Sequence, residues 1–180
     1  MSVWLERAAI VIASLILSIG LIALLSGFFA GRDQAGVSGT GNVPGQQFQD
    51  LGHAQLHPGQ QRPAYNSNPP TSGAHIPAPI TSDESQLSND QILQALESGD
   101  VVILYGTATP PPGLGELARS LGRFTPPLAG AGQAVVLGRR STVSGLIALA
   151  WARMLRVQSV RDPALQQFVQ QTLGRGAPGR

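Results

Sequence analysis

An uncharged apolar segment near the N-terminus constrains the architecture of this chain most strongly. Residues 8–30 read AAIVIASLILSIGLIALLSGFFA and contain no charged side chain. At a rise of about 1.5 Å per residue, a helix of this length could cross a hydrocarbon core about 30 Å thick. A signal peptide is the alternative, but its apolar region would span only about 7–15 residues, and Phe28 spoils a small-x-small cleavage site. We therefore predict a retained transmembrane helix.

The residues around this segment predict its orientation. Arg7 precedes it, partly offset by Glu6, whereas Arg32 is followed at once by Asp33. This weak bias places residues 1–7 in the cytoplasm and the rest of the chain outside it. At 100° per residue, five small residues share one helical face, on which a helix of a partner or of a second copy could pack: Ala9, Ala13, Gly20, Ala23 and Gly27. Because Gly and Ala are common in membrane helices anyway, this packing is a hypothesis.

The composition excludes several classes of function. With 180 residues, the chain has room for one domain of ordinary size besides the membrane segment and a linker. It has no cysteine, which excludes disulfides, iron–sulfur clusters, thiol nucleophiles and thiolate metal sites. The formal net charge is +2, the arginines are scattered and aromatic residues make up 5% of the chain, so we expect no nucleic-acid binding.

Segments with different local patterns follow the apolar segment. Residues 31–47 are rich in Gly and Gln and predict a flexible linker. Residues 48–79 hold all three histidines and many prolines, which predicts an ordered but irregular segment. Regular structure becomes legible after Leu87. We expect the folded domain to span residues 48–176, followed by a short tail at 177–180.

The patterns after Leu87 predict helices and strands. Ser88 and Gln91 have the spacing of a capping box, and the apolar stripe that follows them ends before Gly99, which predicts a short helix. Residues 101–105 (VVILY) are a continuous apolar run, typical of a strand covered on both faces. Three further elements are expected: a helix from about Leu114 to Gly122, a strand at 134–137, and a final helix that begins at Asp162 and Pro163 and ends at Gly174.

The segment 143–157 is ambiguous. Its Ala and Leu content favours a helix, whereas the alternation of Ile147, Leu149 and Trp151 favours a strand, which is our prediction. The resulting order is helix, strand, helix, two strands and helix. This order predicts an α/β fold in which a small single-sheet domain with packed helices follows the long irregular segment and the transmembrane helix.

Some stretches resemble a known family. Residues 65–75 (YNSNPPTSGAH) resemble the pattern Y-x-x-x-P-P-T-S-G-x-H of the bacterial "domain of unknown function 3105" family. Two further matches are QALESG at residues 94–99, which resembles the family's H-A-L-E-H-G element, and Ala150-Trp151 before Asp162 and Phe168, which resembles its A-W…D…F pattern. The resemblance covers about residues 48–176. It implies a membrane-anchored domain outside the cytoplasm and no established activity.

Candidate chemistry lies with the histidines. In the resemblance, Gln94 and Ser98 replace two family histidines. Four remaining groups could supply nitrogen and oxygen ligands to a divalent ion such as zinc or copper: His53, His57, His75 and Glu97. No two of them have a strong metal-site spacing. The alternative is that His75 only hydrogen-bonds within the PPTSG turn and that Glu97 belongs to an ordinary helix end.

The sequence leaves two functions open. We expect a non-catalytic accessory or interaction subunit of a membrane complex, placed outside the cytoplasm at the cell membrane, with metal binding as the alternative. Catalysis is not expected. Ser72 or Ser98 could be drawn with His75 as a triad, but the sequence has no G-x-S-x-G elbow, P-loop or dinucleotide motif. No cofactor is expected other than the zinc or copper ion.

Overall fold

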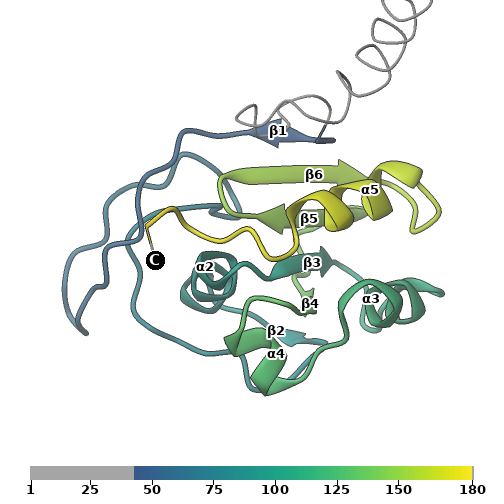
Figure 1. The fold of residues 1–180 in the computed structure, drawn as a ribbon, viewed down its shortest axis with the longest axis horizontal. Coiled ribbons are helices and arrows are strands. Elements are labelled where there is room, and N and C mark those ends of the chain that lie inside the picture. Colours follow the sequence, from purple (N-terminus) through teal and green to yellow (C-terminus); the bar gives the residue numbers. More distant parts are fainter. Residues whose placement is uncertain (1–42, 180) are drawn as a thin grey trace, which may run out of the picture. The chain divides into compact units, whose positions relative to one another are not determined.

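The computed structural model describes residues 43–179, and a mixed β-sheet forms their centre (Figure 1). Its strands are β1 (Gln46–Gln47), β2 (Ser85–Gln86), β3 (Val101–Tyr105), β4 (Val135–Arg139), β5 (Leu146–Ala150) and β6 (Arg153–Val157). The six strands lie in the order β1-β6-β5-β3-β4-β2. The pairs β3–β4 and β2–β4 are parallel, and the other pairs are antiparallel.

Within residues 43–179, four helices accompany the sheet, and the predicted caps begin two of them. They are α2 (Asn89–Ser98), α3 (Leu114–Gly122), α4 (Pro126–Gly130) and α5 (Pro163–Thr172). The capping box of α2 is confirmed, because Ser88 Oγ accepts a hydrogen bond from Gln91 N and Gln91 Oε1 accepts one from Ser88 N. The cap of α5 is confirmed as well, since Asp162 Oδ1 accepts from Ala164 N at 2.9 Å.

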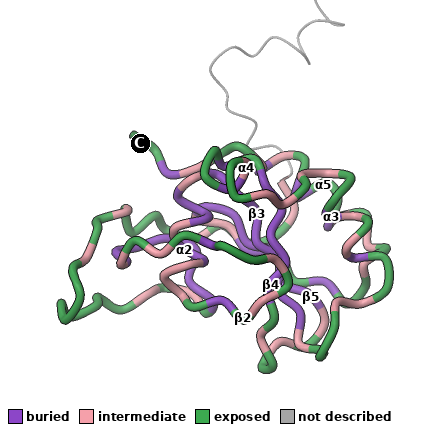
Figure 2. Tube along the Cα trace, turned by 90° about the horizontal axis from the view of Figure 1, so that it is seen from below, coloured by how far each residue is buried: buried purple, intermediate pink, exposed green. Residues whose placement is uncertain are grey.

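The sheet separates two apolar cores. Side chains alternate along a strand, so Val102 and Leu104 pack with α2 and α4, whereas Val101, Ile103 and Tyr105 pack with α3 and α5. Every residue of β3 is buried, as the continuous VVILY run predicted. Figure 2 shows the buried parts of the chain along the central strands. Each face of the sheet is therefore covered by its own cluster of buried apolar side chains.

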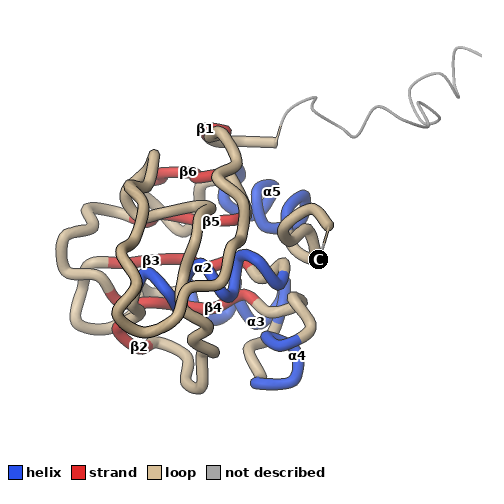
Figure 3. Tube along the Cα trace, turned by 90° about the vertical axis from the view of Figure 1, so that its left-hand side faces the viewer, coloured by secondary structure: helices blue, strands red, loops and turns tan. Residues whose placement is uncertain are grey.

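The predicted irregular segment, residues 48–79, lies against the side of the domain that carries α2 (Figure 3). Main-chain hydrogen bonds attach it to the turn between β5 and β6: Phe48 N donates to Ala152 O at 2.9 Å, and Ala152 N donates to Thr71 O at 2.9 Å. Because these bonds come from two distant points of the segment, its loops are held in a fixed arrangement.

Some elements differ from the prediction. Residues 143–157 form a hairpin of β5 and β6 instead of one strand, and Ala152 adopts a φ of 54° in the connecting turn. No Gly or Asn marks this turn in the sequence, so its position was not predicted. The strands β1 and β2 have only two residues each, which is too short for a periodic pattern. β1 lies within the segment expected to be a linker.

The predicted fold class requires a correction. It joined a membrane-spanning helix to the α/β domain, but within residues 43–179 no helix has the length and apolar character to cross a membrane. The longest helices there, α2 and α5, have 10 residues each, about 15 Å at 1.5 Å per residue against a core of about 30 Å. The predicted helix at 8–30 and its small-residue face (Ala9, Ala13, Gly20, Ala23, Gly27) lie outside the described residues.

Candidate functional site

His75 lies in a buried turn of the irregular segment. The residue is 0% exposed. The turn pairs with an earlier stretch of the same segment, because Gly73 N donates to Gly52 O at 2.8 Å and His75 N donates to Ala54 O at 3.1 Å. These bonds fix the backbone of His75, so its imidazole ring enters the domain interior from a defined position.

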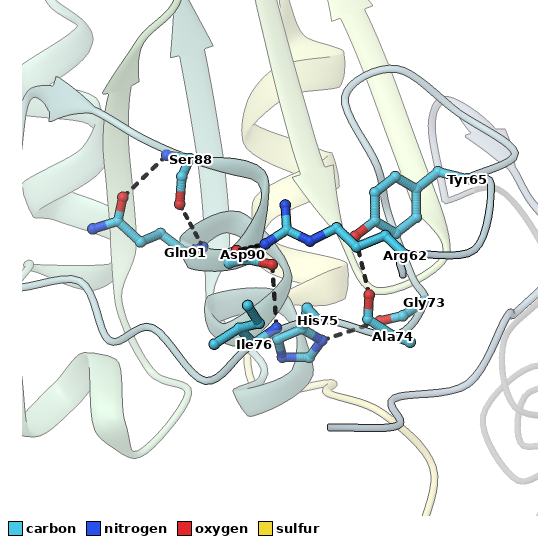
Figure 4. Close-up of polar contacts among 9 residues, drawn as sticks. All are labelled: Arg62, Tyr65, Gly73, Ala74, His75, Ile76, Ser88, Asp90 and Gln91. Atoms are coloured by element: carbon cyan, nitrogen blue, oxygen red, sulfur yellow. Dashed lines mark hydrogen bonds and ion pairs between the residues drawn. The ribbon is translucent and has the colours of Figure 1, made fainter. Parts of the chain in front are cut away.

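The two ring nitrogens of His75 have different surroundings. Nδ1 lies 3.0 Å from Gly73 O (Figure 4), and because a carbonyl only accepts hydrogen bonds, we assign a proton to Nδ1. Nε2 lies 3.1 Å from Glu97 Oε2. The two atoms are close but not aligned as a hydrogen bond, and among the described residues neither has a hydrogen-bond partner. In a neutral ring, Nε2 therefore presents a lone pair toward the carboxylate.

Glu97 belongs to the last turn of α2 and lies between two histidines. Its side chain is 6% exposed. The second oxygen, Oε1, lies 3.6 Å from His53 Nδ1, and the His53 side chain is 36% exposed. The carboxylate thus has one fully buried imidazole on one oxygen and a solvent-accessible imidazole near the other.

Trp151 supports the position of His53 from the hairpin turn. The centroids of the two rings are 6.3 Å apart, with an interplanar angle of 70°, so the rings meet edge to face. Trp151 Nε1 donates to Asp50 Oδ2 at 2.9 Å, which holds the indole in place. Trp151 belongs to the predicted strand alternation and to a family pattern, but neither signal predicted this contact, because Trp151 and Asp50 are 101 positions apart along the chain.

The N-terminal end of α2 is attached to the same irregular segment. Asp90 Oδ1 accepts a hydrogen bond from Ile76 N at 3.2 Å, and Arg62 forms an ion pair with the Asp90 carboxylate (Figure 4). Nearby, Tyr65 Oη donates to Ala74 O at 3.0 Å. Burial raises the pKa of Tyr65, the negative charge of Asp90 raises it further, and Arg62 lowers it. The helix therefore contacts the segment that carries His75 at both ends.

The other predicted site residues lie elsewhere. His57 is exposed and makes neither of the two imidazole contacts of Glu97. Ser72 Oγ is engaged by the main chain, because it accepts from Leu51 N at 3.1 Å and lies 3.4 Å from Gln49 O. The geometry therefore gives no support to a triad built from Ser72.

Gln94 and Ser98 face a neighbouring cavity. Ser98 Oγ donates to Gln94 O at 3.1 Å, within the helix itself. Both residues line a cavity of about 310 Å³, together with Ile80 and Ala129 among others. Neither residue contributes to the ion-pair contacts around Glu97.

The predicted metal ligands are thus brought together in part. Within residues 43–179, no three His, Asp or Glu side chains are arranged to hold a metal ion as they stand. His75 Nε2 lies 3.1 Å from Glu97 Oε2, and His53 Nδ1 lies 3.6 Å from the other oxygen of the same carboxylate.

These features define a mixed α/β domain with a buried His–Glu pair beside a second, half-exposed histidine. A family model described as "Protein of unknown function (DUF3105)" matches residues 57–179, and the chain belongs to this family. The resemblance noted in the YNSNPPTSGAH motif is therefore confirmed. The match includes His75 and Glu97 and begins after His53. No curated protein and no solved structure matched the chain.

Proposed function

We propose that this domain binds one divalent transition-metal ion, zinc or copper, through His75, Glu97 and His53. The buried contact between His75 Nε2 and Glu97 Oε2 carries the proposal. Buried polar atoms without a hydrogen-bond partner cost free energy, and proteins normally avoid them. A metal ion bound to both atoms would offset that cost.

The distances suit a shared ion. Ligand atoms about 2.0–2.2 Å from a tetrahedral ion lie about 3.3–3.6 Å from each other. The observed separations are 3.1 Å between His75 Nε2 and Glu97 Oε2, and 3.6 Å between His53 Nδ1 and Glu97 Oε1. Each of these two separations is close to that spacing, and the His53 side chain would have to rotate to reach an ion held by His75 and Glu97.

The second nitrogen of His75 also favours a ligand role. Metal-binding histidines usually donate the other ring N–H to a carbonyl or carboxylate, which fixes the tautomer and orients the ring. His75 Nδ1 has this arrangement with Gly73 O at 3.0 Å. Imidazole and carboxylate together are suitable donors for zinc and copper.

His53 completes the proposed site by a movement of its side chain. It lies in the irregular segment and is 36% exposed, so its ring has room to turn toward an ion bound at Glu97. Trp151 limits this rotation on one side. Three protein ligands of this kind leave one tetrahedral position for water or another small ligand.

Isothermal titration of the purified full chain with Zn²⁺ or Cu²⁺ tests the proposal, with the bound ion counted by elemental analysis. We expect one ion per chain. Glu97→Gln keeps the size of the side chain but removes the charged ligand, and we expect it to weaken binding at least about tenfold.

His57→Ala is the matched control, because it removes a histidine of the same segment that makes no contact with Glu97. It is expected to bind as tightly as the unaltered chain. A wild-type chain that binds much less than one ion, or equal losses in Glu97→Gln and His57→Ala, would contradict the proposal.

The role as an accessory subunit outside the cytoplasm stays a prediction. It was inferred from the predicted transmembrane helix and linker, the two replaced family histidines and the absence of catalytic motifs, and it is compatible with metal binding. Purification from the native source, with identification of the proteins that accompany the chain, tests it directly. Isolation as a lone monomer would count against it.

A further inference from the structure

The last turn of α2 is capped by a segment from much later in the chain. The final carbonyls of a helix lack partners within the helix and need them from elsewhere. Ala177 N donates to Glu97 O at 3.0 Å, and Gly174 N donates to Gly99 O at 2.9 Å. We call residues 174–177 the strap. It lies directly on the backbone of the residue whose side chain contacts His75.

The strap approaches the end of α2 so closely that only a glycine fits at position 176. A Cβ atom added to Gly176 would lie 2.2 Å from Glu97 O, far inside van der Waals contact. A second segment approaches the next residue of α2. A Cβ atom added to Gly132, which follows α4, would lie 1.8 Å from Ser98 O. The backbone at Glu97 and Ser98 is therefore held in contact with two other segments of the chain.

We infer that the strap is a positioning element for the metal site, which rests on the proposed function. A ligand must be held within about 0.5 Å of its productive position, and loops or helix ends achieve this only with support from neighbouring groups. The hydrogen bond from Ala177 N and the close packing of Gly176 supply that support to Glu97. The strap thereby sets the distance between the carboxylate and the His75 ring.

Gly176→Ala tests the inference, because the added methyl group must displace either the strap or the end of α2. Gly130→Ala is the matched control, since its Cβ would meet no atom within 4 Å. Val169→Ala is a second control. Val169 is 0% exposed in the core on the opposite face of the sheet, so this variant lowers stability away from Glu97.

Two readouts on the purified full chains separate positioning from general destabilisation. We expect Gly176→Ala to weaken Zn²⁺ binding about tenfold and to change the absorption spectrum of bound Co²⁺. In the metal-free protein, we expect it to shift the NMR signals of the His75 ring. Gly130→Ala and Val169→Ala are expected to change neither readout, although Val169→Ala lowers the midpoint of thermal unfolding.

The outcomes distinguish the two proposals. If the wild-type chain binds no Zn²⁺, the proposed function fails, and the His75 signals of the metal-free variants still decide whether the strap positions Glu97. Unchanged His75 signals in Gly176→Ala would overturn the inference. Equal changes in Gly176→Ala and Val169→Ala would overturn it as well, because the effect would then follow from lost stability alone.

Discussion

His75 Nε2 and Glu97 Oε2 lie 3.1 Å apart in the domain interior, and neither atom has a hydrogen-bond partner among the described residues. One comes from an irregular turn and the other from α2, so the fold itself creates the contact. The same carboxylate lies near His53, which is open to solvent.

Replacing His53 should affect metal binding more than stability. His53→Ala removes the proposed third ligand, so we expect Zn²⁺ affinity to fall at least about tenfold. Because the side chain is 36% exposed, the free energy of unfolding should change by less than about 1 kcal/mol. Titration calorimetry and urea denaturation measure the two effects. Unchanged affinity would remove His53 from the site.

The capping box of α2 should contribute measurably to stability. Ser88→Ala deletes the side-chain acceptor of Gln91 N, and loss of such a cap costs about 1 kcal/mol. Ser120→Ala is a suitable control, because that exposed hydroxyl only donates to Leu117 O within α3. Its effect should stay within about 0.5 kcal/mol. Urea denaturation of both variants provides the comparison, and equal losses would count against the cap.

Gly132 should tolerate no side chain. Its φ is +71°, and a Cβ atom would lie 1.8 Å from Ser98 O. Backbone strain and overpacking together predict a loss of about 2–4 kcal/mol for Gly132→Ala. Gly130→Ala should be nearly neutral, because its Cβ would meet nothing within 4 Å. Thermal unfolding of the pair checks this, and similar midpoints would refute it.

Because the pKa of Asp83 is raised, the free energy of unfolding should decrease as the pH rises through the acid range. Burial raises its pKa above the ordinary value of 3.8, although hydrogen bonds from the main-chain amides of Leu137 and Glu84 and the charge of Arg119 oppose the shift. Between 3.8 and the raised value, the folded state binds more protons than the unfolded state, so the free energy of unfolding decreases with increasing pH.

Asp83→Asn removes this titration and can still accept the bond from Leu137 N. The stability of the wild type relative to this variant should therefore decrease as the pH rises from 3.8 through the raised pKa of Asp83. Urea denaturation at several pH values measures the difference. A relative stability that rises with pH would show that the pKa of Asp83 is lowered.

Much of the fold could be predicted because its signals are local. The Ser88–Gln91 box, the VVILY run and the Asp162-Pro163 start each lie within a few consecutive residues. The structure places elements at all three. The turn at Ala152 escaped prediction, because its left-handed conformation is imposed by the pairing of β5 with β6 and not by a turn residue.

The candidate site was less accessible to sequence reasoning. The ligand-type residues could be named, but their contacts depend on pairings between distant segments. The parallel bridge between Gln55 and His75 brings the two histidine-bearing stretches together, and no sequence period announces it. His57 was placed among the candidates on residue type alone, and the structure leaves it exposed. The contact of Trp151 with His53 depends on the hairpin turn that was missed.

The strap also has a consequence for the order of events during synthesis. A chain is made from its N-terminus, so α2 leaves the ribosome well before Ala177. Until then, the carbonyl of Glu97 lacks the N–H that caps it in the finished fold. The contact between Glu97 and His75 therefore reaches its final geometry only when almost all of the described chain has emerged. A nascent chain stalled before Gly174 is accordingly expected to bind Zn²⁺ more weakly than the full chain.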